Sequence, residues 1–304
     1  MLLSNRKTAT FLVLFAGGVW GISFALLKWA AQGGLSPLNL VLWQMMIVSI
    51  ILLLICVITG KLFRLSSVHW SHVIVITLAG NVAPNLFFYY AAEHVPSGVM
   101  AITIALVPMM TYALAFTIQI ESYSMTRFLG IFFGFGAILC LILPETSLPD
   151  PTILPWVLIA SLAGCCYTLE NLYVDCKIDQ QVDFVILLTL ASISSVLILI
   201  PINFMFGTFE MLQWPLTVTE YAITSLAVVN VICYLVFLFL IRMSGSVFAS
   251  QMGYIVTLSG VGWGILLFGE SHSFWVWLAL VLMLIGMAMV TPRNHTVSIS
   301  SNME

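Results

Sequence analysis

Long hydrophobic runs alternate with short polar breaks along almost the whole chain. A helix needs roughly 17–25 mostly apolar residues to cross a lipid bilayer. When the chain is cut at charged residues, Pro and Gly, segments of that kind remain. They lie near residues 9–31, 38–59, 72–92, 97–118 and 126–144, and then near residues 153–175, 183–206, 217–241, 247–268 and 274–291. The pattern therefore predicts an all-α membrane protein with ten transmembrane helices.

The composition excludes a soluble fold. Of the 304 residues, 62% are hydrophobic and 7% are charged, whereas soluble domains carry about 25% charged residues. A water-facing surface cannot be built from so few polar side chains. The six cysteines show no spacing typical of a zinc site or a disulfide framework, so we interpret them as small hydrophobic side chains. We expect no metal, no cofactor and no nucleic-acid partner.

The charged residues between the predicted helices indicate the orientation of the chain. Cytoplasmic loops of membrane proteins are enriched in Lys and Arg. Here the basic residues fall at the N-terminus, in every second connection and in the C-terminal tail, whereas the other connections contain no Lys or Arg and their charges are acidic. This alternation predicts that both termini face the cytoplasm. The basic residues of the predicted cytoplasmic segments are Arg6, Lys7, Lys61, Arg64, Arg127, Lys177, Arg242 and Arg293, and the acidic residues of the opposite connections are Glu93, Glu145, Asp150, Glu210 and Glu270.

The second half of the chain repeats polar positions of the first half at one fixed offset. The matched positions are Asn81 and Asn230, Ser97 and Ser246, and Glu121 and Glu270. We predict two five-helix repeats, at residues 1–146 and 147–291, and a disordered cytoplasmic tail at residues 292–304. An odd number of spans gives the two halves opposite orientations, which is typical of secondary transporters. The alternative is that two apolar stretches resemble each other by composition alone.

Several motifs follow one another along the two halves of the chain. They are the GGVWGISF run at Gly17–Phe24, the segment Phe87–Met110, Glu121, Gly130 and Gly136 in the first half, and Leu235–Gly253, Glu270 and Gly286 in the second. In these motifs the chain resembles the drug/metabolite transporter superfamily, specifically its EamA-type branch. The resemblance implies a ten-helix basket with a central cavity and alternating access in a bacterial inner membrane. It also implies movement of amino acids or other small metabolites, often outward.

Polar side chains within hydrocarbon are costly and mark cavities or helix contacts. Asn81, Asn85 and Tyr89 recur one helical turn apart, and Asn230 and Tyr234 repeat this pattern in the second half. Both sets fall near the middle of their spans, where transporters built from repeats bind their substrates. We predict that these two polar faces line the substrate cavity. Hydrogen bonds between helices are the alternative.

Trp20, Phe24 and Lys28 share one face of the first span. An aromatic ring near the middle of the membrane suits a ligand with a planar or apolar end, so we include Trp20 and Phe24 in the predicted substrate site. Lys28 lies near the outer end of the span. We expect its amine to reach the lipid headgroups, and the alternative is a role in coupling or in binding a substrate carboxylate.

Glu170 is the most informative charge because it lies inside the sixth span, beside Tyr167 and Asn171. Burial disfavours the ionised form of a carboxylate, and the helix rise places Lys28 too far away along the membrane normal to form a salt bridge with Glu170. We therefore predict that Glu170 binds a substrate amine or a coupling proton, with Tyr167 and Asn171 in the same site. The alternative is a carboxylate that reaches the cytoplasmic interface.

Pro108 interrupts the fourth span near its middle, because it removes one backbone hydrogen bond. Tyr112 lies one turn beyond it, and Gln251 and Tyr254 are polar residues of the ninth span. We add these four residues to the predicted substrate site. A kink without a role in transport is the alternative for Pro108.

The sequence therefore predicts a secondary transporter for a small polar or amphipathic metabolite, with amino acids and efflux expected first. We do not expect an enzyme, since the chain contains neither HExxH nor GxSxG and its five histidines are scattered. An integral membrane enzyme and a sensor are the alternative classes. The expected partners are a small-molecule substrate, membrane lipid and a coupling proton, for a monomer or a homodimer.

Overall fold

The computed structural model describes residues 2–61, 68–142, 151–179, 181–244 and 252–290, and these residues form helices and loops without a strand. The helices of the first half are α1 (Leu2–Gly21), α2 (Ser23–Ala31), α3 (Pro37–Ile58), α4 (Trp70–Val75), η2 (Ile76–Val82), α5 (Ala83–Ala92), α6 (Ser97–Ile104), α7 (Val107–Thr117) and α8 (Met125–Ile142). Those of the second half are η3 (Pro151–Ile153), α9 (Leu154–Lys177), α10 (Phe184–Phe206), α11 (Val218–Ser244), α13 (Met252–Phe268) and α14 (Phe274–Val290).

These helices make up the predicted set of membrane spans. Eight continuous or nearly continuous helical segments are long and apolar enough to cross a bilayer, and α13 and α14 are two shorter apolar helices. The prediction of a ten-helix all-α membrane protein is therefore confirmed. The ninth helix begins at residue 252, later than the predicted 247, and residues 245–251 lie outside the described part of the chain.

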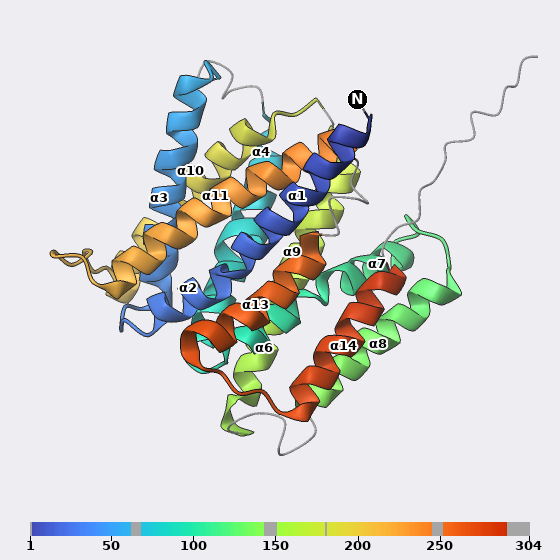
Figure 1. Ribbon diagram of the computed structural model, residues 1–304. Helices are drawn as coiled ribbons and strands as arrows, with labels where there is room; N and C mark the ends of the chain where they lie inside the picture. The colour runs from blue at the N-terminus through green and yellow to red at the C-terminus, as the bar shows by residue number, and fades with distance from the viewer. Residues whose placement is uncertain (1, 62–67, 143–150, 180, 245–251, 291–304) are drawn as a thin grey trace, which may run out of the picture.

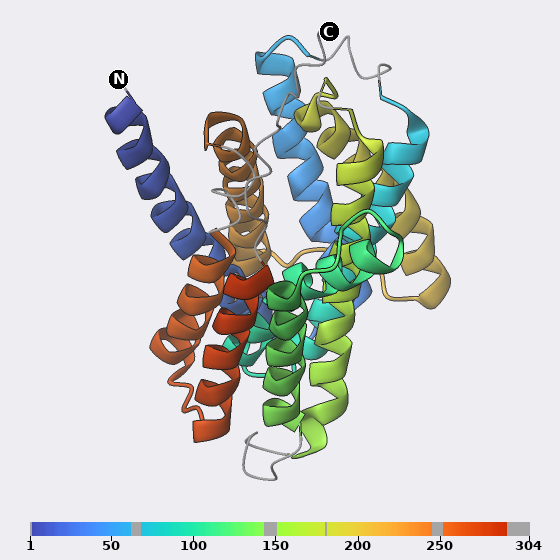
Figure 2. The same cartoon turned by 90° about the vertical axis from the view of Figure 1, so that its right-hand side faces the viewer.

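The helices pack in pairs that join the two halves of the chain. α8 lies along α14, α3 lies along α10, and α1 lies between α11 and α13 (Figure 1). Within the core, α5 lies against α9. α1 begins at one end of the molecule, and the α13–α14 loop lies at the opposite end, which we call the far end (Figure 2).

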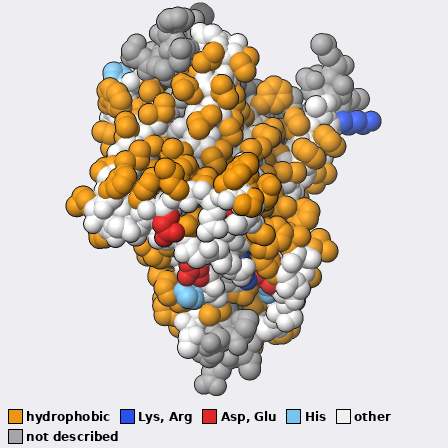
Figure 3. Space-filling view, turned by 90° about the vertical axis from the view of Figure 1, so that its left-hand side faces the viewer, with side chains coloured by type: hydrophobic (Ala, Val, Ile, Leu, Met, Phe, Trp, Pro, Cys, Tyr) orange, Lys and Arg blue, Asp and Glu red, His pale blue; other side chains and the backbone are white. Residues whose placement is uncertain are grey.

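The outside of the bundle suits a lipid environment. One side of the molecule is largely hydrophobic, and the acidic side chains on this face lie in its middle and lower parts (Figure 3). Many large apolar side chains are exposed, among them Phe132, Leu197 and Leu266. In hydrocarbon such side chains belong on the outside. The chain is a multi-pass membrane protein.

Small residues allow α8 and α14 to approach closely. A Cβ added to Gly286 would lie 2.7 Å from the carbonyl oxygen of Gly130, and a Cβ added to Gly130 would lie 2.8 Å from the carbonyl oxygen of Gly286. Side chains at these positions would separate the two backbones. The glycines of the fifth and tenth spans therefore serve helix packing.

The first span is broken near its middle, between α1 and α2. The amide of Ile22 donates to the carbonyl of Val19 over 3.2 Å, and the carbonyl of Gly18 is left without its usual partner four residues on. Trp263 on α13 donates its Nε1–H to this carbonyl over 2.9 Å. A freed carbonyl inside a membrane needs such a partner. A neighbouring helix thus stabilises the break.

The third span contains a π-helical turn, η2. Pro84, at the start of α5, has no amide to donate to the carbonyl of Gly80, and a π-turn provides a wider loop at this point. The side chain of Asn85 donates to the carbonyl of Asn81 over 2.7 Å. Turns of this kind are frequent at functional sites. The side chains that pack against η2 are therefore candidates for the functional site.

The fourth span is interrupted as the position of Pro108 predicts. α6 ends at Ile104, α7 begins at Val107, and Pro108 lies in the first turn of α7. The hydroxyl of Thr168 on α9 donates to the carbonyl of Val107 over 3.5 Å. The first, third and fourth spans therefore all depart from regular α-helix near the middle of the bundle.

Candidate functional site

Five predicted site residues from three different spans gather near the middle of the bundle, and we call them the central cluster. They are Trp20 of α1, Tyr167 and Glu170 of α9, and Asn230 and Tyr234 of α11. Trp20 donates its indole N–H to Asn230 Oδ1 over 3.1 Å. The rings of Trp20 and Tyr234 meet edge-on, with their centroids 6.2 Å apart. The break after Trp20 places its ring among helices of the second half.

Glu170 is the acidic group of the central cluster, and it is 8% exposed. Its carboxylate lies directly against η2, since a Cβ added to Gly80 would be 2.4 Å from Oε1. Tyr167 and Tyr234 lie close enough to interact with it electrostatically. Within the described part of the chain, Glu170 has neither an ion pair nor a hydrogen bond. A carboxylate in this setting favours a proton or a bound cation.

Aromatic rings surround the central cluster. Phe24 meets Phe88 with ring centroids 5.9 Å apart, and Phe88 lies 6.5 Å from Tyr167. The ring centroids of Phe237 and Trp20 are 6.3 Å apart. The faces of aromatic rings attract cations as well as apolar groups. The surroundings therefore suit a molecule that carries a positive group on an apolar body.

The polar face of the third span points elsewhere. Asn81 donates to Ser195 of α10 over 3.4 Å, and Asn85 accepts from Gln44 of α3 over 3.3 Å. Tyr89 is fully buried and donates to Gln44 over 2.7 Å. These groups bond neighbouring helices to one another, which is the alternative that the sequence left open for them.

The remaining predicted site residues are spread over the molecule. Asn171 is exposed on α9, Pro108 lies in the first turn of α7, and Tyr254 is half-buried on α13. Tyr112 donates to the carbonyl of Ser122 over 3.2 Å, in the connection to α8. Gln251 lies outside the described residues. Asn171, Pro108 and Tyr112 therefore do not join the central cluster.

Lys28 does not reach the lipid headgroups, so that expectation is wrong. Its Nζ lies 3.1 Å from Glu270 Oε1, and its side chain is 14% exposed. As predicted, Lys28 does not pair with Glu170. The partner was missed because no sequence pattern shows that the α13–α14 loop folds over the end of α2.

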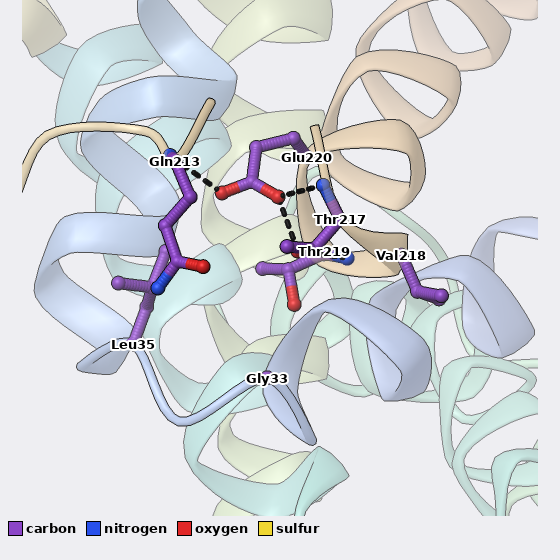
Figure 4. A pocket seen from close by; sticks show the side chains of 7 residues that line it. All are labelled: Gly33, Leu35, Gln213, Thr217, Val218, Thr219 and Glu220. Carbon is purple, nitrogen blue, oxygen red and sulfur yellow. Dashed lines mark hydrogen bonds between the residues drawn. The ribbon is translucent and has the colours of Figure 1, made fainter. Parts of the chain in front are cut away.

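A pocket of about 300 Å³ lies at the far end, where the α2–α3 loop meets the start of α11 (Figure 4). Its acidic group, Glu220, accepts hydrogen bonds from the amides of Gln213 (2.9 Å) and Thr217 (2.8 Å), and from the Thr217 hydroxyl. Thr217 and Glu220 form a capping box for α11. The carboxylate of Glu220 thus caps the N-terminus of α11.

A second pocket of about 310 Å³ lies between α7, α8 and α9. Apolar side chains such as Met110 and Leu158 line most of it. Neither pocket is lined by a residue of the central cluster. The candidate site is therefore defined by the contacts around Glu170.

Comparison with known proteins gives a family match for the first half of the chain. Residues 7–143, which contain α1 to α8 with the exception of residues 2–6, match the model of a family described as the EamA-like transporter family. The first half of the chain is therefore similar to the EamA-like transporter family. The predicted resemblance to the EamA-type branch of the drug/metabolite transporter superfamily is confirmed over these residues, and the family match indicates a membrane transporter.

Other comparisons concern the fold of the whole chain. A solved structure titled "Crystal structure of protein" is similar over 94% of this chain and 98% of its own, with a TM-score of 0.62 and 16% sequence identity. At this identity the similarity shows a shared fold. No curated protein matches the chain.

Two residues at the central cluster were missed from the sequence. Ser23 donates its hydroxyl to Asn230 Oδ1 over 3.3 Å, and Gly80 leaves room for the carboxylate of Glu170. The spacing of Gly80 and Pro84, four residues apart, was the available signal, because a proline at that distance marks an interrupted helical turn.

Proposed function

We propose that this protein is a secondary transporter for small amphipathic metabolites that carry an ammonium group, and that the central cluster is its substrate site. Amino acids and related amines belong to this class. We further propose export across a bacterial inner membrane by alternating access, as the family resemblance implies. Glu170 binds the ammonium group, and the surrounding rings accept the apolar part.

The single observation that carries the proposal is the buried carboxylate of Glu170. A charge inside a membrane protein is costly unless a partner compensates it, and within the described residues Glu170 has no cationic partner. A substrate ammonium group supplies that partner. The rings of Tyr167, Tyr234 and Trp20 add cation–π attraction.

The helix pairings support an inverted repeat. If spans one to five are exchanged with spans six to ten, the contact of α1 with α13 becomes the contact of α9 with α6 and α7, and both contacts exist. The pairs α3–α10 and α8–α14 are unchanged by the exchange. Such a repeat supports alternating access around a site near the middle of the bilayer.

The direct test is transport by the purified protein in proteoliposomes. Radiolabelled amino acids and amines are compared with analogues in which hydrogen replaces the amino group. We expect flux of amino compounds alone, and a decrease of about tenfold or more in Glu170→Gln, since hydrogen bonds to charged groups contribute about 1.5–3 kcal/mol. Asp175→Asn is the matched control, because Asp175 is an exposed carboxylate on the same helix.

Three results would contradict the proposal. Normal transport by Glu170→Gln, or equal flux of the analogues without an amino group, would remove Glu170 from the site. The absence of flux for every solute, under every imposed ion gradient and in both directions, would overturn the transporter function itself.

A further inference from the structure

At the far end, one carboxylate joins three separate parts of the chain. Glu270, in the α13–α14 loop, contacts the end of α2 and the first residues of α6. We call the group formed by Lys28, Ser97, Gly98, Glu270 and His272 the far-end latch. Lys28, Ser97 and Gly98 belong to the first half of the chain, and Glu270 and His272 belong to the second.

Both oxygens of the Glu270 carboxylate are fully engaged. Oε1 accepts from the Ser97 amide (2.7 Å), the Ser97 hydroxyl (3.0 Å) and Lys28 Nζ (3.1 Å). Oε2 accepts from the Gly98 amide (3.0 Å) and lies 3.5 Å from His272 Nε2. The carboxylate thus caps the N-terminus of α6, where unpaired amides and the helix dipole favour a negative charge.

The latch is closely packed, and its side chains are almost completely shielded from solvent. The side chains of Glu270 and His272 are 7% and 2% exposed. A Cβ added to Gly264 would lie 2.5 Å from Glu270 Oε2, and a Cβ added to Gly98 would lie 2.8 Å from His272 Nε2. This fit exists only while α6 and α13 are held together at the far end.

The carboxylate of Glu270 is held in its charged form. Burial alone would raise its pKa, but the Gly98 amide, the charge of Lys28 and the Ser97 amide together lower the pKa below the usual range. Burial lowers the pKa of His272, as does the charge of Lys28, and together they outweigh the opposite effect of Glu270. The latch therefore combines a carboxylate, an ammonium group and a neutral imidazole near pH 7.

The repeat counterpart of Glu270 makes a different contact. Glu121, at the end of the fourth span, pairs with Arg127 of α8 over 2.7 Å, and its side chain is 32% exposed. That ion pair lies within the first half of the chain. Of these two matched carboxylates, Glu270 alone bonds the halves to each other among the described residues.

We propose that the far-end latch closes the far end of the bundle in the conformation described, and that its contacts break each time the protein opens on that side. This inference rests on the proposed transport function. Lys28 and Glu270 then set the fraction of molecules that are open at the far end. Loss of either side chain shifts the population toward the open form, because an interaction present in only one state biases the equilibrium.

The test measures access to a buried position behind the latch. The six native cysteines are replaced, and Val99, which is fully buried in α6, is changed to Cys as a reporter. A membrane-impermeant maleimide is added without substrate. We expect labelling about tenfold faster in Glu270→Ala than with an intact latch, given the strength of charge-assisted hydrogen bonds. Lys28→Met should give a smaller increase, because the carboxylate still caps α6.

Glu121→Gln is the matched control, and it should leave the labelling rate unchanged. Gel filtration and thermal melting confirm that each variant is folded, and Glu270→Gln replaces Glu270→Ala if the latter does not fold. Unchanged labelling in both Lys28→Met and the Glu270 variant that folds overturns the latch, whatever the transport result. Faster labelling in a protein that moves no solute supports the latch as a closure and overturns only the transport function.

Discussion

At the scale of single residues, Gly80 determines where the carboxylate of Glu170 can lie. A methyl group at this position would come within 2.4 Å of Oε1, so the flexible carboxylate has to move away while the backbone stays in place. We expect Gly80→Ala to fold normally and to bind an amino substrate about tenfold more weakly, as judged by equilibrium binding to the purified protein.

Gly164→Ala is the control for this prediction. Its new methyl group lies on the helix that carries Glu170, at an ordinary contact distance of 3.6 Å from Val107 Cγ2. Equal affinity in Gly80→Ala and the unchanged protein would show that the position of the Glu170 carboxylate does not determine binding.

Residue identities predicted part of the candidate site because polar groups inside hydrocarbon are costly wherever they occur. Tyr167, Glu170, Asn230 and Tyr234 were selected for that reason. Trp20 was selected as an aromatic ring near the middle of the membrane, and the structure brings all five together. The same rule selected Asn81 and Tyr89, whose polar groups bond to neighbouring helices. Periodicity along one helix does not reveal which neighbour a polar face meets, so cavity lining and helix bonding could not be separated.

At the scale of helices, the contact of α8 with α14 depends on the absence of side chains. Gly286→Ala would place a methyl group 2.6 Å from Met109 Cε and 2.7 Å from the carbonyl oxygen of Gly130. Overpacking of this kind lowers the free energy of unfolding by about 1–3 kcal/mol. Thermal melting in detergent should therefore show a lower melting temperature for Gly286→Ala than for the unchanged protein.

Gly262→Ala in α13 provides the control, because an added methyl group there meets no atom within 4 Å. It should melt at the temperature of the unchanged protein. An equal melting temperature for Gly286→Ala would mean that α8 and α14 are able to separate without cost.

Span positions were predictable from length and hydrophobicity, because a bilayer imposes both. The interruption at Pro108 was predictable as well, since proline removes an amide. The break at Ile22 was not, because it depends on Trp263, a residue more than two hundred positions away whose indole N–H bonds to the freed carbonyl. Interruptions supported by distant side chains leave no mark in the local sequence.

At the scale of the whole molecule, the distribution of Lys and Arg predicts that both termini face the cytoplasm. Single cysteines introduced at residues 5 and 300 of a cysteine-free variant should both resist an impermeant maleimide in intact cells, and both should react in inside-out vesicles. Labelling of one terminus in intact cells would contradict an even number of spans. It would also remove the basis for an inverted repeat.

The pairing of helices across the two halves has a consequence for a shortened chain. The faces of α3 and α8 that meet α10 and α14 in the complete protein would lose their covering in a polypeptide that ended after the fifth span. A second copy of the same fragment, inserted in the opposite orientation, could cover these faces. We therefore expect a polypeptide of half the length to fold stably only as an antiparallel dimer.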